Sequence, residues 1–158
     1  MIEVKGVTKS FDGKTILHGV DATFQTGKTN LIIGQSGSGK TVLMKSLVGL
    51  LKPEKGQILF DGRDVMAMNG DQVKQLREEI GMLFQGSALF DSETVLGNVM
   101  FPLIMFSKMT YSEMLDRAHF CLERVNLKGA DNKYPSEISG GMQKRVAIAR
   151  AIALNPKY

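Results

Sequence analysis

The chain has 158 residues, of which 43% are hydrophobic and 23% charged, and its formal net charge is +4. These values describe an ordinary globular chain that is long enough for one domain with a real core. Lysine and glutamate are mixed along the sequence, so no basic stripe argues for nucleic acid. The longest apolar stretch, residues 99–106, is far too short to span a bilayer. A single cysteine, Cys121, excludes an intrachain disulfide, and we expect it to be a packed thiol on a helix.

The predicted elements form a strand-rich first half and a helical second half. In chain order they are strands at 2–8, 20–24 and 29–34, a helix at 40–51, a strand at 57–60, a helix at 69–79, a strand at 80–84, a helix at 110–125 and a helix that begins at Gly140. Asp12-Gly13 signals a hairpin turn. Capping boxes are expected where Asn69 precedes Gln72 and where Thr110 precedes Glu113.

A glycine-rich motif follows the predicted strand at residues 29–34. Residues 34–41 fit the phosphate-binding pattern G-x-x-x-x-G-K-[ST]. Glycines let successive N–H groups turn toward a phosphate, and the next helix adds partial positive charge at the same place. The pattern predicts that Lys40 reaches the β- and γ-phosphates of a nucleotide and that Thr41 offers its hydroxyl to Mg²⁺. The expected nucleotide contacts are Gly34, Ser36, Gly37, Ser38, Gly39, Lys40 and Thr41.

A second motif, at residues 138–142, narrows the class of protein. Ser139 is a good helix N-cap, and Gly140 and Gly141 leave the helix entry bare, so a phosphate or another backbone can come close. The segment resembles the signature motif of ABC-type ATPases. The usual form of that motif is L-S-G-G-Q, and here isoleucine replaces the leucine and methionine replaces the glutamine. One face of the predicted helix carries Met142, Val146, Ala149 and Ala153.

The resemblance implies roles for further residues. Phe11 stands where the family places an aromatic ring that stacks on adenine, although a core phenylalanine is the simpler alternative. Gln85 stands where the family carries its Q-loop glutamine, which touches Mg²⁺ or the attacking water and links the nucleotide to the membrane partner. Ser139, Gly140 and Gly141 would face the γ-phosphate that another copy holds. The implied cofactors are ATP and Mg²⁺.

The implied fold is α/β: a P-loop NTPase core of ABC type with an antiparallel β-subdomain and an inserted helical subdomain. The C-terminal part of the core is expected to be missing. Residues 1–85 are expected to form the nucleotide-binding core with its β-subdomain, and residues 86–140 the helical subdomain. The signature helix is expected at residues 139–154.

Two parts of the family's catalytic machinery have no match in this chain. The family needs a Walker B strand that ends in Asp-Glu, just after the signature helix, and a switch histidine further on. The chain stops at Tyr158, where that strand should begin. Asp61 and Asp91 follow apolar residues, but they fall in a hairpin turn and a loop, and both histidines precede the signature. We therefore expect weak MgATP binding, negligible turnover and exposed apolar surface.

In the complete protein, the resemblance implies that two ATPase subunits sandwich two nucleotides head to tail. Together they drive a transmembrane permease from the cytoplasmic face of the membrane. Residues 84–91, 95–103 and 135–142 are similar to the ATPase of the Mla/Mce-linked phospholipid and lipid transporters. The apolar, Met-rich stretch after Gln85 is a candidate docking groove for the permease, and simple core packing is a compatible alternative.

Three alternatives stay open to different degrees. An ATPase of an amino-acid or methionine importer is the nearest competitor. A nucleotide-sensing regulatory or scaffold protein without turnover comes from a different class. A cytosolic ABC protein that acts on nucleic acid or ribosomes is disfavoured, because the chain has no basic patch.

Overall fold

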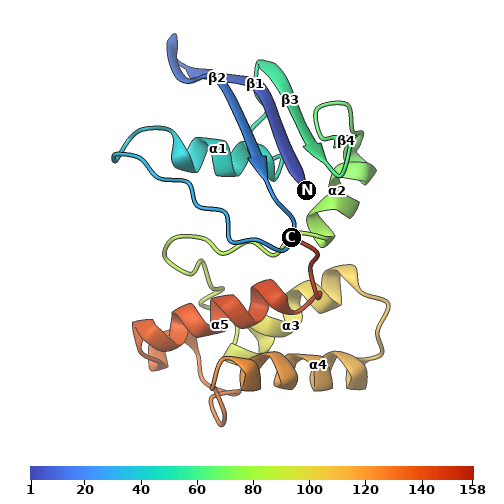
Figure 1. The fold of residues 1–158 in the computed structure, drawn as a ribbon. Helices are drawn as coiled ribbons and strands as arrows, with labels where there is room; N and C mark the ends of the chain where they lie inside the picture. The colour runs from blue at the N-terminus through green and yellow to red at the C-terminus, as the bar shows by residue number, and fades with distance from the viewer. The chain divides into compact units, whose positions relative to one another are not determined.

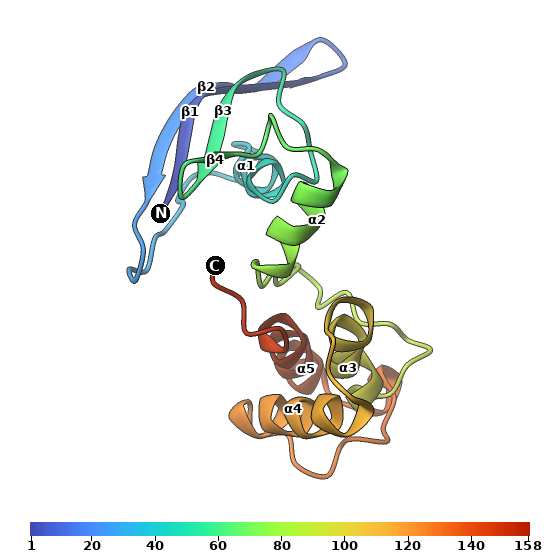
Figure 2. The same cartoon turned by 90° about the vertical axis from the view of Figure 1, so that its right-hand side faces the viewer.

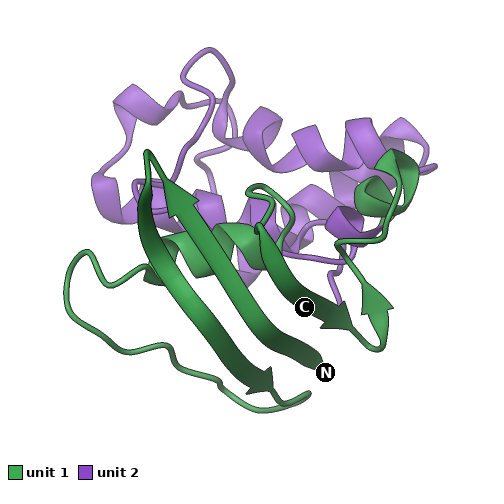
Figure 3. Cartoon of the chain, turned by 90° about the horizontal axis from the view of Figure 1, so that it is seen from above, with its two compact units in different colours: residues 1–75 green, residues 76–158 purple.

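The structure, a computed structural model, describes all of residues 1–158. The chain forms two compact units, residues 1–75 and residues 76–158, which Figure 3 shows in separate colours. Helix α2 (Gly70–Glu78) begins in the first unit and ends in the second. None of the helices has the length and apolar character that a membrane crossing needs.

The first unit is built on one antiparallel sheet with the strand order β2-β1-β3-β4. Its strands are β1 (Ile2–Phe11), β2 (Lys14–Phe24), β3 (Lys55–Phe60) and β4 (Arg63–Asp64). Asp12 and Gly13 have φ values of 49° and 77° at the tip between β1 and β2. Two successive positive values are the pattern of a type I′ turn, so the predicted hairpin is confirmed.

A bulge in β1 brings two valines to the same buried face. Val4 and Val7 are both buried although they lie an odd number of residues apart. The pairing of β1 with β2 shifts register between them, and Gly6 takes a φ of 60° there. The bulge adds one residue to β1 and so shifts by one the alternation of inward and outward side chains. Both valines are therefore buried, as are Leu17, Ile58 and Phe60.

Helix α1 (Lys40–Leu47) lies against one face of this sheet (Figures 1 and 2). It is shorter than the predicted helix at 40–51. Gly49 has a φ of 67° just beyond its end, and the N–H of Leu50 donates back to the Lys45 oxygen at 2.9 Å. This left-handed glycine closes the helix before the Lys52-Pro53 stop that the sequence suggested.

The predicted strand at residues 29–34 is not formed. These residues lie outside the one sheet, and Leu31 and Ile33 are 77% and 83% exposed. A strand that is apolar on both faces needs partner strands and covering layers, and no segment of this chain pairs with it. The expected exposure of apolar surface is therefore found here.

The predicted strand at residues 80–84 is also absent, although one step of a parallel pairing is present. Tyr158 donates its N–H to the Glu79 oxygen at 3.0 Å and accepts the N–H of Gly81 at 2.8 Å. These two bonds flank Ile80 as in a parallel ladder. The pairing goes no further, and the side chains of Leu83 and Phe84 are exposed.

The second unit is helical. It contains α3 (Val95–Phe106), α4 (Tyr111–Arg124), the 3₁₀ turn η1 (Pro135–Glu137) and α5 (Gly140–Ile152). Helices α3, α4 and α5 pack against one another (Figures 1 and 2). Their shared core comprises Val95, Val99, Met100, Leu103, Ala118, Cys121, Leu122, Leu127, Ala130, Ile138, Val146, Ala149 and Ala153. Cys121 is a buried thiol on α4, as predicted.

The helix starts agree with the sequence because capping is local. Thr110 and Glu113 form both bonds of a capping box, with the Thr110 N–H donating to Glu113 Oε2 at 2.7 Å. Asn69 and Gln72 exchange two bonds of 3.0 Å. Ser139 caps α5 by accepting the N–H of Met142 at 3.3 Å. All three predicted starts are confirmed.

Candidate functional site

The glycine-rich loop leads directly into the first turn of α1. Lys40 folds back on this loop: its Nζ donates to the Gly34 oxygen at 2.7 Å and to the Gln35 oxygen at 2.6 Å. The N–H of Ser38 closes the loop by donating to the Gln35 oxygen at 3.2 Å. No acidic residue lies in the first turn of α1, so nothing offsets the positive field of the helix start.

Gly39 fixes the angle at which the loop enters the helix. It is buried and has a φ of 90°. A Cβ at this position would lie 3.2 Å from the Ile16 oxygen and 3.0 Å from Leu17 Cδ2. Only a residue without a side chain fits both the left-handed backbone and the close approach of β2. The glycine therefore positions the Lys40 end of the loop against the sheet.

Phe11 lies at the end of β1 and is 41% exposed, so it is not the core phenylalanine of the simpler alternative. Lys9 Nζ lies 5.1 Å from the centroid of its ring. Glu54 holds that ammonium through a 2.7 Å bond and also accepts the N–H of Ser10 at 2.7 Å. The hydrogen bond from Lys9 and, to a smaller extent, the bond from Ser10 lower the pKa of Glu54. The ring is thus exposed and backed by an ion pair.

Gln85 lies exposed in a tight turn of the second unit. The turn is closed by the N–H of Ser87, which donates to the Phe84 oxygen at 3.1 Å. Arg150 on α5 donates to the oxygens of Ser87 and Ala88, both at 2.9 Å. This contact could not be predicted from the sequence, because it joins residues that lie far apart in the chain.

Asn98 holds the loop that follows this turn. It is fully buried on α3, and its Oδ1 accepts the N–H of Phe90 at 2.8 Å. Its Nδ2 donates to the oxygens of Phe90, Glu93 and Thr94 at 3.0–3.2 Å. The role of Asn98 could not be predicted from the sequence, since an asparagine inside an apolar helix has no local signature.

The signature segment forms the exposed start of α5. Ser139, Gly140 and Gly141 are all exposed, and a Cβ on Gly140 would meet nothing within 4 Å. The first turn of α5 carries no acidic residue. Gln143 anchors the turn to η1 by donating to the Pro135 oxygen at 2.8 Å. The segment is therefore an exposed helix start, which is the end of a helix that favours an anion.

The predicted site residues fall into the two units. Phe11 and the loop of residues 34–41 belong to the first, and Gln85 and residues 139–141 belong to the second. Within the first unit, Gly39 and Lys40 are fixed by the contacts above. Within the second, Arg150 joins the helix of the signature to the turn of Gln85.

Two of the carboxylates and histidines weighed from sequence, Asp61 and His119, have local partners. Asp61 pairs with the N-terminal amine of Met1 in the turn between β3 and β4. Asp91 is exposed in a turn, and His119 lies 3.4 Å from Asp131 on the surface. No group of three or more His, Cys, Asp or Glu side chains in residues 1–158 could hold a metal ion.

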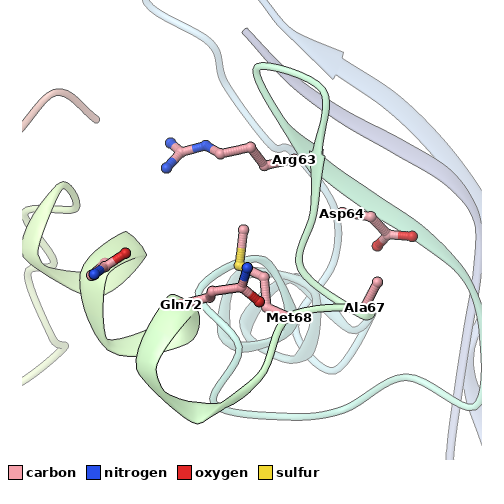
Figure 4. Close-up of a pocket in the computed structure, with 6 residues that line it drawn as sticks. Arg63, Asp64, Ala67, Met68 and Gln72 are labelled. Carbon is pink, nitrogen blue, oxygen red and sulfur yellow. The ribbon is translucent and has the colours of Figure 1, made fainter.

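A shallow pocket of about 310 Å³ lies elsewhere in the first unit. Its walls are Arg63, Asp64, Ala67, Met68, Gln72 and Gln75 (Figure 4). The side chains of Arg63 and Asp64 point in opposite directions in this view. Asp64 accepts the N–H of Met66 at 2.9 Å and Gln72 caps α2, so these polar groups serve the local fold. No residue of the glycine-rich loop lines the pocket.

Comparison with known sequences gives the family. The sequence pattern of the ABC transporter family matches residues 17–158. The chain therefore belongs to the ABC transporter family. It is 44% identical over 156 residues to a Mycobacterium leprae protein named "Probable ribonucleotide transport ATP-binding protein mkl", covering 99% of this chain and 45% of that protein. It thus spans about half the length of this relative.

Two further relatives carry different transport names. The Haemophilus influenzae intermembrane phospholipid transport ATP-binding protein MlaF is 40% identical over 99% of this chain and 59% of its own length. The Escherichia coli L-cystine transport ATP-binding protein TcyN is also 40% identical, over 99% of this chain and 64% of its own length. The named substrates therefore differ among relatives of equal similarity.

Solved structures confirm the fold. The ATP-binding cassette MJ0796, in a dimeric post-hydrolysis state with ADP and Pi, superposes with a TM-score of 0.90 at 35% identity. The match covers 99% of this chain and 71% of that one. The cassette cbiO1 from Clostridium perfringens gives a TM-score of 0.86 at 30% identity, covering 98% of this chain and 62% of that one. The predicted α/β fold of ABC type is confirmed.

Proposed function

We propose that this chain is the ATP-binding part of an ABC transporter ATPase subunit that couples ATP binding and hydrolysis to transport across a membrane. The observation that carries the proposal is the loop of residues 34–41 at the start of α1, with Lys40 directed onto it. The family and the cassette fold support it. The activity, substrates and partners of the whole protein are part of the proposal.

We expect the loop to hold the phosphates of ATP. Gly37 and Gly39 have φ values of 80° and 90°. This left-handed conformation allows successive N–H groups to turn toward an anion. Lys40 bonds only to neutral carbonyl oxygens. A phosphate would offer this ammonium a charged partner at little cost, because those bonds are exposed. Thr41 and Gln85 would complete the shell of the Mg²⁺ ion that accompanies the nucleotide, which neutralises charge on the phosphates.

Ser139, Gly140 and Gly141 would serve a nucleotide held by a second copy. Their support is the exposed, uncharged start of α5 and the dimeric state of the cassette MJ0796. Phe11 would stack on the adenine through its exposed ring. A head-to-tail dimer of ATPase subunits, docked on a permease at the cytoplasmic face of the membrane, follows from these roles.

The transported molecule is proposed to be a phospholipid or another lipid. Residues 84–91, 95–103 and 135–142 support this branch by their similarity to the Mla/Mce-linked ATPases, and the name of the Haemophilus influenzae relative agrees. The names of cystine and methionine transport relatives support an amino-acid importer as the second candidate. A regulatory protein without turnover is the candidate from another class.

Calorimetric titration with MgATP tests the nucleotide site. Lys40→Ala should abolish binding, because it removes the charge that meets the phosphates. Lys45→Ala is the matched control, since Lys45 lies in the last turn of the same helix, away from the loop. Equal affinities in the wild type and both variants would contradict the proposal.

The substrate branch needs the complete ATPase with its permease in lipid nanodiscs. Phospholipid should stimulate ATP hydrolysis, whereas methionine and cystine should not. Stimulation by an amino acid alone would move the protein to the importer branch. A soluble partner in place of a permease would favour regulation.

A further inference from the structure

Arg150, a residue of α5, forms hydrogen bonds to the turn that follows Gln85. Its Nη1 donates to the Ala88 oxygen and its Nη2 to the Ser87 oxygen, both at 2.9 Å. Its guanidinium carbon also lies 5.7 Å from the centroid of the Phe90 ring. Burial lowers the pKa of Arg150. The charge is met by two carbonyl dipoles and an aromatic face, and such charge-assisted bonds are stronger than neutral ones.

Arg150 holds a turn in which Ser87 and Ala88 adopt a left-handed backbone conformation, which is unfavourable for residues other than glycine. Gly86, Ser87 and Ala88 have successive φ values of 85°, 66° and 48°. The N–H of Ala88 donates to the Gly86 oxygen at 2.8 Å, so Ser87 is the central residue of a γ-turn. With a positive φ at the centre, this is the rare and strained form of that turn. Non-glycine residues in this region are strained, and they persist only where the surroundings hold them. Arg150 bonds to the carbonyls of both strained residues.

We propose that Arg150 is a positioning residue for Gln85, which fixes the turn of Gln85 to the helix that begins at the signature. Arg150 lies ten residues after Gly140, which places it about 15 Å along the helix axis. Between these two ends, α5 packs into the core of the second unit through three buried residues, Val146, Ala147 and Ala149. The inference rests on the proposed function, which gives Gln85 its contact with Mg²⁺ or water.

Arg117 on α4 is a matched control for purely structural effects. It too donates two bonds to neighbouring carbonyls, those of Ala153 at 2.8 Å and Ile152 at 2.9 Å. Its guanidinium carbon lies 5.2 Å from the centroid of the Phe120 ring. The two arginines therefore have nearly the same chemistry in the same unit. They differ in what they hold, because Arg117 holds the end of α5 and Arg150 holds the turn of Gln85.

Hydrogen exchange of the free chain tests the positioning directly. Arg150→Lys should raise the exchange rates of the Ser87 and Ala88 amides about tenfold or more, since one ammonium cannot replace a two-pronged contact. Amides in the middle of α4 should keep their rates. Arg117→Lys should leave the turn unchanged. Equal rates in the turn for both variants, or a rise that only follows global unfolding, would overturn the proposal.

Nucleotide affinity gives the second readout. Arg150→Lys should weaken MgATP at least threefold while leaving the binding of ATP in EDTA unchanged, because Gln85 acts through the metal shell. Arg117→Lys should change neither. An equal loss with and without Mg²⁺ would contradict a role through Gln85. If the wild type binds no MgATP, the proposed function fails, and the exchange comparison still decides whether Arg150 positions the turn.

Discussion

The Lys40 ammonium donates to the backbone oxygen of Gly34 at 2.7 Å, so the residue expected to meet phosphate bonds to its own loop. A Cβ on Gly34 would lie only 2.7 Å from Ser38 Oγ. The loop is thus tightly folded around Lys40. Its stability depends on the glycines that shape it.

Gly39→Ala should destabilise the chain by about 1–3 kcal/mol, because alanine resists a φ of 90° and its Cβ would press on β2. Gly140→Ala is the control. Gly140 lies in α5 with open space around it, and alanine favours a helix, so stability should hold or rise. Urea unfolding measures both. A loss of equal size in the two variants would show that the backbone of Gly39 is not special.

Glu54 should make stability depend on pH in the acid range. The folded state lowers the pKa of Glu54 from its ordinary value of 4.5, chiefly through the bond from Lys9. A lowered pKa contributes stability above the unfolded value, and that stability is lost as the pH falls below it. Thermal unfolding between pH 7 and pH 3 should therefore show a smaller decline for Glu54→Gln than for the wild type. Parallel declines would contradict the assignment.

Asn98→Ala should cost about 2–4 kcal/mol, since it removes the four hydrogen bonds by which a fully buried side chain holds the loop of residues 90–94. Ser107→Ala is the control. The Ser107 hydroxyl makes one bond, to the Leu103 oxygen at 2.7 Å, and its loss should cost less than about 1 kcal/mol. Chemical denaturation compares the two. If Asn98→Ala were as mild as the control, the loop would not depend on Asn98.

The chain should hydrolyse ATP negligibly. Lys40, Thr41 and Gln85 are proposed to bind MgATP, but Asp61 and Asp91 lie in turns, and we do not expect either carboxylate to orient the attacking water. Phosphate release under saturating MgATP measures this. A steady-state rate within about tenfold of a typical enzyme turnover of ~10 per second would contradict the prediction.

The sequence could predict the features that depend on neighbours in the chain. The Thr110–Glu113 and Asn69–Gln72 caps and the Asp12-Gly13 turn involve residues at most three apart, so their signals are complete in a short window. The glycine-rich loop and the signature helix were found for the same reason. The roles of their residues in binding stay predictions.

The sequence could not predict what depends on distant partners. Residues 29–34 and 80–84 have strand composition, but a strand forms only with a neighbour, and the pairing at Ile80 stops after one step. Arg150 and Asn98 bind backbone oxygens, which every residue carries. The type of the accepting residue therefore gives no sign of such a hydrogen bond in the sequence.

The exposed segment at residues 31–33 also affects how the chain behaves at high concentration. Leu31 and Ile33 offer bare apolar side chains on a backbone without ladder bonds. Such a segment is a template for the same segment of another molecule, and edge-to-edge stacking of this kind leads to aggregation. A lysine introduced at Leu31 or Ile33 should act as a gatekeeper and keep the isolated chain in solution.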